Sequence, residues 1–82
     1  MRIEWDEHKR RLNIEKHGLD FADLTLEFFE SALIEHAAET RLRAIGALGE
    51  GSIVTVIFRP LGTEALSIIS VRRASKAERN RR

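Results

Sequence analysis

Residues 53–58 read Ile-Val-Thr-Val-Ile-Phe, and this run constrains the fold more than any other part of the chain. β-branched and aromatic side chains favour strands, and successive side chains of a strand point to opposite faces of a sheet. Because apolar residues occupy both alternating sets of positions, a strand with this sequence needs cover on both faces. We therefore expect residues 52–59 to form a central strand.

Extended patterns lie on both sides of this strand in the sequence. Arg2-Ile3-Glu4-Trp5 alternates polar and apolar residues, which predicts a short first strand. The glycines of Gly49-Glu50-Gly51 can take positive φ and favour a hairpin turn, and Pro60-Leu61-Gly62 predicts a second turn. Further strands are predicted at residues 32–37, 41–48 and 65–72.

Two helices are predicted before the strands of the sheet. Asp6 is a suitable N-cap and Gly18 a suitable C-cap for a helix over residues 7–17. Asp20 caps a second predicted helix, which extends to residue 29 or 30. Its apolar stripe consists of Phe21, Leu24 and Phe28. We interpret these phenylalanines as core packing and not as a binding site.

The end of the chain, Ile68–Arg79, is predicted to be a buried strand that leads directly into a basic helix. Ser75 and Glu78 have the spacing of a capping box, in which each side chain satisfies a backbone N–H of the first turn. Arg72 and Arg73 lie at the junction. A strand that ends in two cations can hold an anion in a fixed place; alternatively, the two arginines only mark where the strand leaves the core.

The predicted order of elements is β-α-α-β-β-β-β-α, in a single domain over residues 1–82. A strand and two helices followed by a meander indicate the α+β class, with an antiparallel sheet and helices packed on one face. At 82 residues the core is modest, and an obligate partner would supplement its stability.

The composition excludes several classes of protein. The chain has no cysteine, which rules out a disulfide framework and a thiolate metal site. No apolar run approaches the roughly 18 residues of a membrane span, and the first residues do not resemble a signal peptide. We therefore expect a soluble, cytoplasmic protein without a membrane partner.

The charges are unevenly placed, although the formal net charge is only +1. Residues 72–82 carry six Lys or Arg against one acid, whereas residues 20–64 carry three against eight acids. A basic terminal segment on a balanced protein indicates a polyanion or an acidic partner surface. The alternative is a solvated C-terminus.

Three segments together resemble the BrnT toxin family, and they run nearly the whole length of the chain. The first is Trp5-Asp6-x-x-Lys9-x-x-x-Asn13-x-x-Lys16-His17-Gly18-x-x-Phe21. The second is Glu39-x-Arg41 followed by Gly46, and the third is Ile68-Ile69-Ser70-x-Arg72-x-Ala74-x-x-x-Glu78-Arg79. The chain departs from the family where members often carry a Tyr shortly after the Glu-Arg pair, because the matching position here is Arg82.

The resemblance implies a small ribonuclease toxin of a type II toxin–antitoxin pair, with a fold like that of RelE. It also implies a BrnA-like antitoxin with a ribbon-helix-helix DNA-binding domain. The toxin would then reach operator DNA only through this antitoxin, as part of a complex that represses its own promoter. The substrate would be RNA, and the toxin would inhibit translation until the antitoxin binds.

Metal-independent RNA cleavage needs a base for the 2′-hydroxyl proton, cations for the phosphorane, and an acid for the leaving oxygen. His17 is the best acid–base candidate, because the pKa of a histidine lies near working pH. Its alternative role is only to help end the helix. The three histidines lack the spacing of a zinc site, so neither a metal nor a cofactor is expected.

Arg41 and Arg43 are the candidate electrophiles of the middle segment. They lie two residues apart on one predicted strand face, about 7 Å from each other, so that both guanidiniums could bind one phosphodiester. Glu39 would share this face as a possible base. The alternative is an exposed cross-strand ion-pair ladder with Glu35.

Arg72 is the single residue that we most expect to be functional, on a strand face predicted to include Leu66, Ile68 and Ser70. Ser70 is its candidate neighbour at the RNA. Further substrate-binding candidates are Lys9 and Lys16 on one helix face, and Lys76 and Arg79 in the basic segment. The competing functions are a non-enzymatic binding module, and an inactive family member that acts as co-repressor with the antitoxin.

Overall fold

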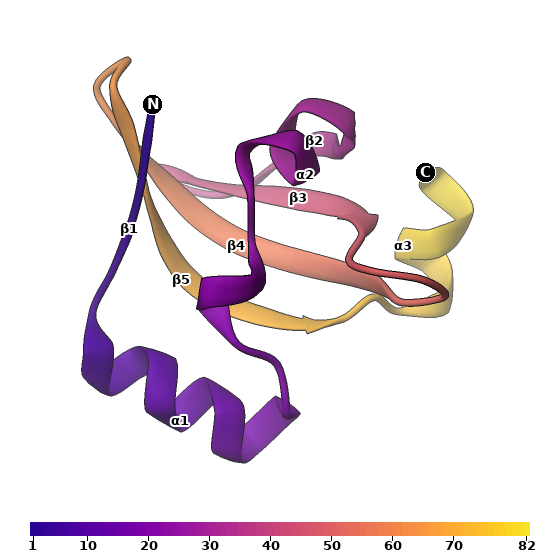
Figure 1. Cartoon of the computed structure of the whole chain (residues 1–82). Coiled ribbons are helices and arrows are strands. Elements are labelled where there is room, and N and C mark those ends of the chain that lie inside the picture. Colours follow the sequence, from indigo (N-terminus) through magenta and orange to yellow (C-terminus); the bar gives the residue numbers. More distant parts are fainter.

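A five-stranded sheet, in the order β1-β5-β4-β3-β2, carries the fold (Figure 1). The computed structural model describes all 82 residues. The strands are β1 (Arg2–Trp5), β2 (Leu33–Ala38), β3 (Arg41–Ala47), β4 (Ile53–Leu61) and β5 (Ala65–Arg73). The α-helices are α1 (Glu7–His17), α2 (Leu26–Ser31) and α3 (Lys76–Arg81), and a short 3-10 helix η1 covers Phe21–Asp23.

β4 is the middle strand of the five, as its apolar sequence predicts. It pairs antiparallel with β3 on one side and β5 on the other. The turn predicted at Pro60-Leu61-Gly62 is present but starts only at Gly62, which takes φ 64°, because β4 continues to Leu61 and Pro60 pairs with Leu66. β3 reaches only as far as Phe58, so Pro60 has a neighbouring strand on one side and its missing N–H leaves no gap in the sheet.

The α+β class and the order of elements are confirmed, and the sheet is mixed because β1 joins it in parallel. Arg2 to Trp5 pair with Ala65 to Ile68 of β5 in a parallel register. The chain then passes through three helical segments before it enters β2 at the opposite edge of the sheet. The first strand therefore meets the last one, a pairing that neighbouring residues in the sequence do not reveal.

The first helix has the predicted caps, and one of its residues ties it to β5. The Asp6 side chain accepts from the N–H of Lys9, and Gly18 takes φ 69° as a left-handed C-cap. Asn13 is buried, and its amide pairs with both backbone groups of Val71, at 3.0 and 3.1 Å. β1 ends before this point of β5, so the Asn13 side chain replaces a neighbouring strand at the edge of the sheet.

The predicted second helix is two separate pieces, which corrects the expectation of one helix from Asp20 to residue 30. η1 ends at Leu24, whose φ and ψ of −78° and 138° are extended. Thr25 then caps α2 by accepting from the N–H of Phe28, so a new helix starts inside the predicted one. The apolar stripe still reaches the core, because Phe21, Leu24 and Phe28 are all buried.

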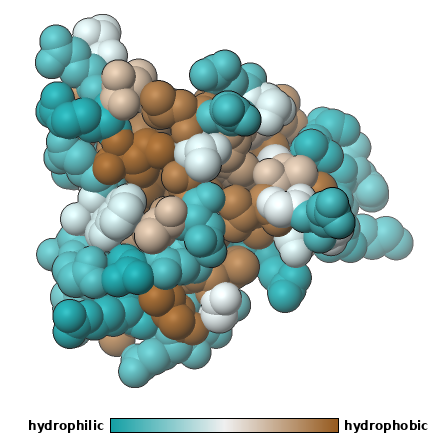
Figure 2. Space-filling view, viewed as in Figure 1, coloured by the Kyte–Doolittle hydropathy of each residue, from teal (hydrophilic) through white to brown (hydrophobic).

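The core fills the face of the sheet beneath η1 and α2. Alternate residues of β4 enter it, and the other contacts come from the helical phenylalanines and from β3 and β5. Figure 2 shows apolar surface across the middle of this side and polar surface around it. The members of the buried cluster are Phe21, Leu24, Phe28, Ala44, Val54, Val56, Phe58, Leu66, Ile68 and Val71.

The last helix lies on the opposite face, so the expectation that all helices pack on one face is wrong. Thr55 alternates with Val54 and Val56 and therefore points away from the main core. It is fully buried and donates a hydrogen bond to Glu78 of α3. α3 thus covers the second face of β4, which agrees with the double cover that the strand's sequence requires.

A β-bulge in β5 decides which of its side chains reach that second face. Ile57 pairs with Ser70, whereas the next residue, Phe58, pairs with Ile68, so Ile69 is the extra residue. The bulge shifts the alternation by one position. Ser70 and Arg72 consequently lie on the face opposite Leu66 and Ile68, which corrects the predicted strand face.

Candidate functional site

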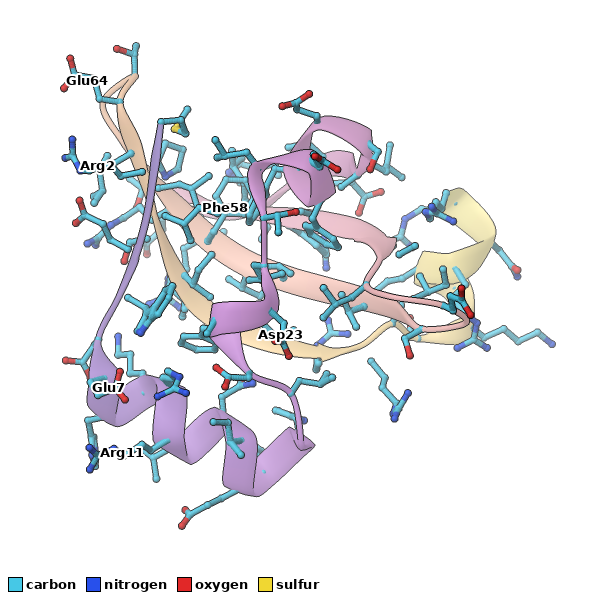
Figure 3. The ribbon with its side chains drawn as sticks, viewed as in Figure 1. Arg2, Glu7, Arg11, Asp23, Phe58 and Glu64 are labelled. Carbon is cyan, nitrogen blue, oxygen red and sulfur yellow. The ribbon has the colours of Figure 1, made fainter.

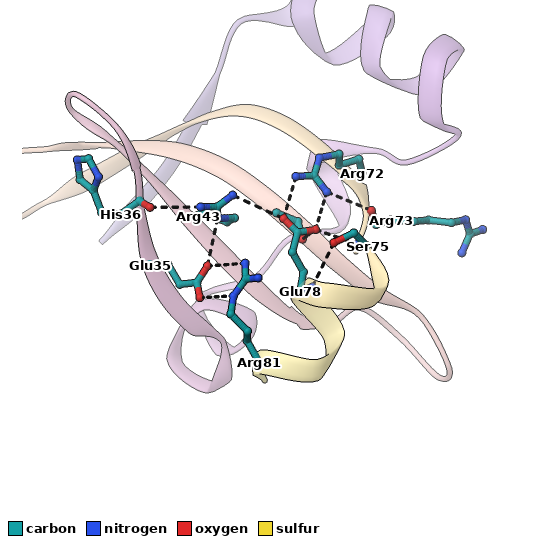
Figure 4. Close-up of polar contacts among 9 residues, drawn as sticks. Glu35, His36, Arg43, Arg72, Arg73, Ser75, Glu78 and Arg81 are labelled. Atoms are coloured by element: carbon teal, nitrogen blue, oxygen red, sulfur yellow. Dashed lines mark hydrogen bonds and ion pairs between the residues drawn. The ribbon is translucent and has the colours of Figure 1, made fainter.

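Arg72 and Glu78 form the centre of a polar cluster on the second face of the sheet (Figure 4). The Arg72 guanidinium donates from Nη1 to Glu78 Oε1 at 2.7 Å and from Nη2 to Oε2 at 2.9 Å. Both hydrogen bonds are charge-assisted, and their parallel arrangement fixes the plane of the guanidinium. The arginine side chain keeps about a third of its surface exposed, at 35%. The orientation of the guanidinium is therefore fixed, and part of the side chain remains accessible from solvent.

Glu78 is buried, with only 4% of the residue exposed. Besides Arg72, its Oε1 accepts from the Thr55 hydroxyl at 2.9 Å and from the backbone N–H of Ser75 at 2.8 Å. Hydrogen bonds from Arg72 lower the pKa of the Glu78 carboxyl far below its usual range, and those from Ser75 and Thr55 act in the same direction. The carboxylate is therefore charged at any physiological pH.

Arg43 joins this cluster from β3. Its Nη1 lies 3.7 Å from Glu78 Oε2, and its Nε lies 3.2 Å from Glu35 Oε1 without an aligned hydrogen bond. Glu35 also binds Arg81 of α3 through two hydrogen bonds of 2.7 and 3.0 Å. The predicted alternative of an ion pair between Arg43 and Glu35 is thus present. Three arginines face two carboxylates here, which leaves the cluster positive.

A groove of about 330 Å³ lies between α1 and β5 and brings together four of the predicted site residues. Lys9, Lys16 and His17 line it from the helix, and Ser70 lines it from the strand. Lys9 and Lys16 share this wall because residues seven apart lie on one side of a helix. The groove thus combines two ammonium groups, an imidazole and a hydroxyl.

β5 connects the groove with the arginine cluster. Ser70 and Arg72 are alternate residues of one strand and lie on the same face after the bulge. The groove and the cluster are therefore neighbouring parts of one surface. Chemically, this surface offers an imidazole at one end and guanidiniums fixed by ion pairs at the other, which is suited to a phosphodiester.

Arg41 and Glu39 lie apart from this centre, at the hairpin between β2 and β3. Arg41 is exposed at the first position of β3 and borders a hollow of about 250 Å³ with Ala38 and Glu39. Glu39 is in the turn with φ 47°, so the expectation that it shares a strand face with the two arginines is wrong. The turn needs a left-handed residue, which removes Glu39 from the strand.

The two candidates from α3 have different surroundings. Lys76 is exposed in the first turn of the helix. Arg79 donates from Nη1 to the backbone carbonyl of Ala74 at 2.9 Å, which holds its side chain near the start of the helix. No group of three His, Cys, Asp or Glu side chains has the arrangement that could hold a metal ion.

The family model described as "Ribonuclease toxin, BrnT, of type II toxin-antitoxin system" matches residues 5–78. The chain belongs to the BrnT family. The crystal structure of the Brucella abortus ribonuclease toxin BrnT is similar to it, with 56% sequence identity and a TM-score of 0.88. The match covers 93% of this chain and 99% of the Brucella chain. A comparison with curated proteins finds no significant match.

Membership of the BrnT family makes the chain a ribonuclease toxin of a type II toxin–antitoxin system, as the resemblance in the sequence implies. RNA as the substrate and an antitoxin as the partner follow from this class. None of the three α-helices is both long and apolar enough to cross a membrane.

Sequence reasoning assigned Glu78 to the capping box alone, and the box is present in full. It missed that the same carboxylate binds Arg72. The sequence holds one signal of this second role, because Glu78 is the only acid among the six basic residues of the terminal segment. Thr55 was also missed, since a threonine in an apolar strand gives no sign of a charged partner.

Proposed function

We propose that this BrnT-family chain is an endoribonuclease that cleaves RNA without a metal ion, by attack of the 2′-hydroxyl on the adjacent phosphate. The observation that carries the proposal is the groove between α1 and β5, which places His17, Lys9 and Lys16 beside Ser70. Arg72 follows on the same strand face. Imidazole and fixed cations are the groups that such a reaction requires.

In this mechanism, His17 takes the proton of the 2′-hydroxyl and returns it to the leaving 5′-oxygen, and Arg72 stabilises the charge that develops on the phosphorane. The 2′-oxygen forms a bond to phosphorus while the bond to the 5′-oxygen breaks. The products are a 2′,3′-cyclic phosphate and a 5′-hydroxyl. Lys9, Lys16 and Ser70 bind the neighbouring backbone of the RNA, a role that fixes position without reading sequence.

The remaining candidates extend this surface in both directions. Arg43 would support the phosphate from the cluster, and the exposed Arg41 would contact RNA that continues past β3. Glu39, proposed as a base, could act only on RNA that reaches this turn. Lys76 and Arg79 would contact RNA at the start of α3. Support for these roles is their charge and their place on β3, the adjoining turn and α3.

We further propose that the partner is a BrnA-like antitoxin with a ribbon-helix-helix domain, which neutralises the toxin by covering this basic surface. The toxin itself would reach operator DNA only through that antitoxin. Its activity on RNA would arrest translation in the cytoplasm. Support comes from the family, whose members are toxins of type II systems.

The test is cleavage of a defined RNA by purified protein in EDTA, with mapping of the cut ends. Wild-type protein should leave 2′,3′-cyclic phosphate, and Arg72→Ala and His17→Ala should each lower the rate at least about 100-fold, within the range for general acid–base and electrostatic groups. Cleavage that requires an added divalent ion would refute the metal-free mechanism. RNA binding without any cut product would favour a binding module or co-repressor instead.

A further inference from the structure

Glu78 makes more contacts than a helix cap requires. A capping box needs one hydrogen bond from the N-cap N–H to the N3 carboxylate, here from Ser75 to Glu78 at 2.8 Å. The same carboxylate also binds Thr55 once and Arg72 twice. A glutamine would serve the cap as well as a glutamate does. The negative charge therefore has a purpose outside the cap.

The burial of this charge leads to the same conclusion. Removing a carboxylate from water is costly unless partners replace the lost hydration. Glu78 is almost completely buried, and the charge that compensates it is chiefly that of Arg72. The pair spans two elements, because Arg72 belongs to β5 and Glu78 to α3. The position of the arginine head group is thus set by where α3 docks.

We infer that Glu78 is a positioning residue for RNA cleavage, which orients the Arg72 guanidinium toward the scissile phosphate; this rests on the proposed function. The two bonds occupy Nη1 and Nη2 and leave Nε out of the pair. A long, flexible side chain is thereby restricted to one orientation, with about a third of it, 35%, still exposed. Preorganised donors of this kind need no rearrangement at the moment of reaction.

The alternative relation between the same residues is competition. A carboxylate that occupies the fork of an arginine takes the place that a phosphate would take. If Glu78 competed with RNA, its removal would speed cleavage. Positioning is favoured because Arg43 also approaches Glu78, at 3.7 Å, so one carboxylate faces two guanidiniums and the group stays positive.

Glu78→Gln is the principal variant, because it removes the charge and keeps the cap. We expect kcat for RNA cleavage to fall at least about tenfold while KM changes less than about threefold. Glu78→Asp, which keeps the charge but is too short for the fork, should lose kcat similarly. Ser75→Ala is the matched control: it weakens the same helix start but leaves the arginine pair, so kcat should stay within about twofold of wild type.

Making the same substitution in a second protein variant distinguishes a positioning role of Glu78 from a general effect on stability. In Arg72→Lys protein, which cannot make the paired bonds, adding Glu78→Gln should change kcat by less than about twofold. The pH profile of Glu78→Gln should keep the wild-type shape at a lower height. The inference would be overturned if Glu78→Gln lowered kcat equally in wild-type and in Arg72→Lys protein. It would also be overturned by a folded Glu78→Gln protein with wild-type or higher kcat.

A measurement that does not depend on activity distinguishes this inference from the proposed function. The nitrogen-15 resonances of the Arg72 guanidinium should show restricted rotation in wild-type protein and free rotation in Glu78→Gln, with Arg72→Lys to assign the signal. Restricted rotation without any RNA cleavage by wild-type protein would refute the proposed function alone. Free rotation in wild-type protein would refute the positioning role alone.

Discussion

At the scale of the residue, the charge of Glu78 links the stability of the fold to its chemistry. Its carboxylate accepts hydrogen bonds from β4, β5 and the start of α3. Loss of that charge leaves the partly exposed Arg72 without its principal partner, at a carboxyl position that is itself buried. The energetic consequence is larger than for an exposed ion pair, whose contribution is about 0 to 1 kcal/mol.

We predict that Glu78→Gln lowers the free energy of unfolding by about 2–3 kcal/mol at pH 7. The pKa of Glu78 is lower in the folded protein than the ordinary value of 4.5, chiefly because of Arg72. Its stabilising effect is therefore complete above that value and is lost as the pH falls below it. Urea unfolding between pH 7 and pH 3 should show the gap to wild type closing. An unchanging gap would contradict the ion pair as its source.

The control for this experiment is Glu50→Gln, in the exposed turn between β3 and β4. Its free energy of unfolding should lie within about 0.5 kcal/mol of wild type. Some pH dependence will remain in Glu78→Gln, because Arg81 also lowers the pKa of Glu35 and Arg10 that of Asp20. The difference between Glu78→Gln and wild type gives the part of the pH dependence of stability that is due to Glu78.

At the scale of the element, a close contact between α2 and β3 depends on a missing side chain. Gly46 of β3 faces Phe28 and Ala32, and a Cβ at this position would lie 3.1 Å from Phe28 Cε1 and 3.2 Å from Ala32 Cβ. Phe28 belongs to the buried core and has little room to retreat. A glycine is thus needed here because a side chain would collide with Phe28 and Ala32. The backbone conformation of Gly46 is one that other residues can also adopt.

We predict that Gly46→Ala destabilises the protein by about 1–3 kcal/mol, the usual effect of overpacking a core. Thermal and urea unfolding measure this, and Ala47→Ser on the exposed neighbouring residue should stay within about 0.5 kcal/mol. In a Phe28→Leu background, Gly46→Ala should cost less than it does in wild type if the clash with Phe28 is the cause. Gly46→Ala with unchanged stability would refute the close packing.

The sequence predicted the helix ends well where the capping interaction involves residues only a few positions apart. The caps Asp6 and Gly18 and the box of Ser75 with Glu78 act inside one turn of helix, so their spacing contains the whole interaction. The break at Leu24 was missed because the phenylalanine stripe continues through it. The buried contacts of the stripe come from tertiary packing, which does not require an unbroken helix.

At the scale of the whole molecule, the parts that the sequence could not predict are those that join distant residues. Nothing near β1 reveals its parallel pairing with β5. The bulge at Ile69 reverses the face of Ser70 and Arg72, and alternation alone therefore placed them wrongly. The candidate residues themselves could be named from the sequence, since cations and an imidazole are recognisable by their chemistry, and the groove brings four of them together.

The small net charge of +1 implies that RNA is attracted by a local surface and not by the protein as a whole. We predict that binding of a non-cleavable 2′-O-methyl RNA weakens with salt, and that Lys16→Ala reduces the slope of log affinity against log salt by roughly 0.7, the value for one contact to a single strand. Arg2→Ala should leave the slope unchanged, because Arg2 lies beside Glu64, far from α1 and Arg11 (Figure 3). Equal effects of the two variants would show that RNA binds by diffuse charge, and that the groove between α1 and β5 is not its site.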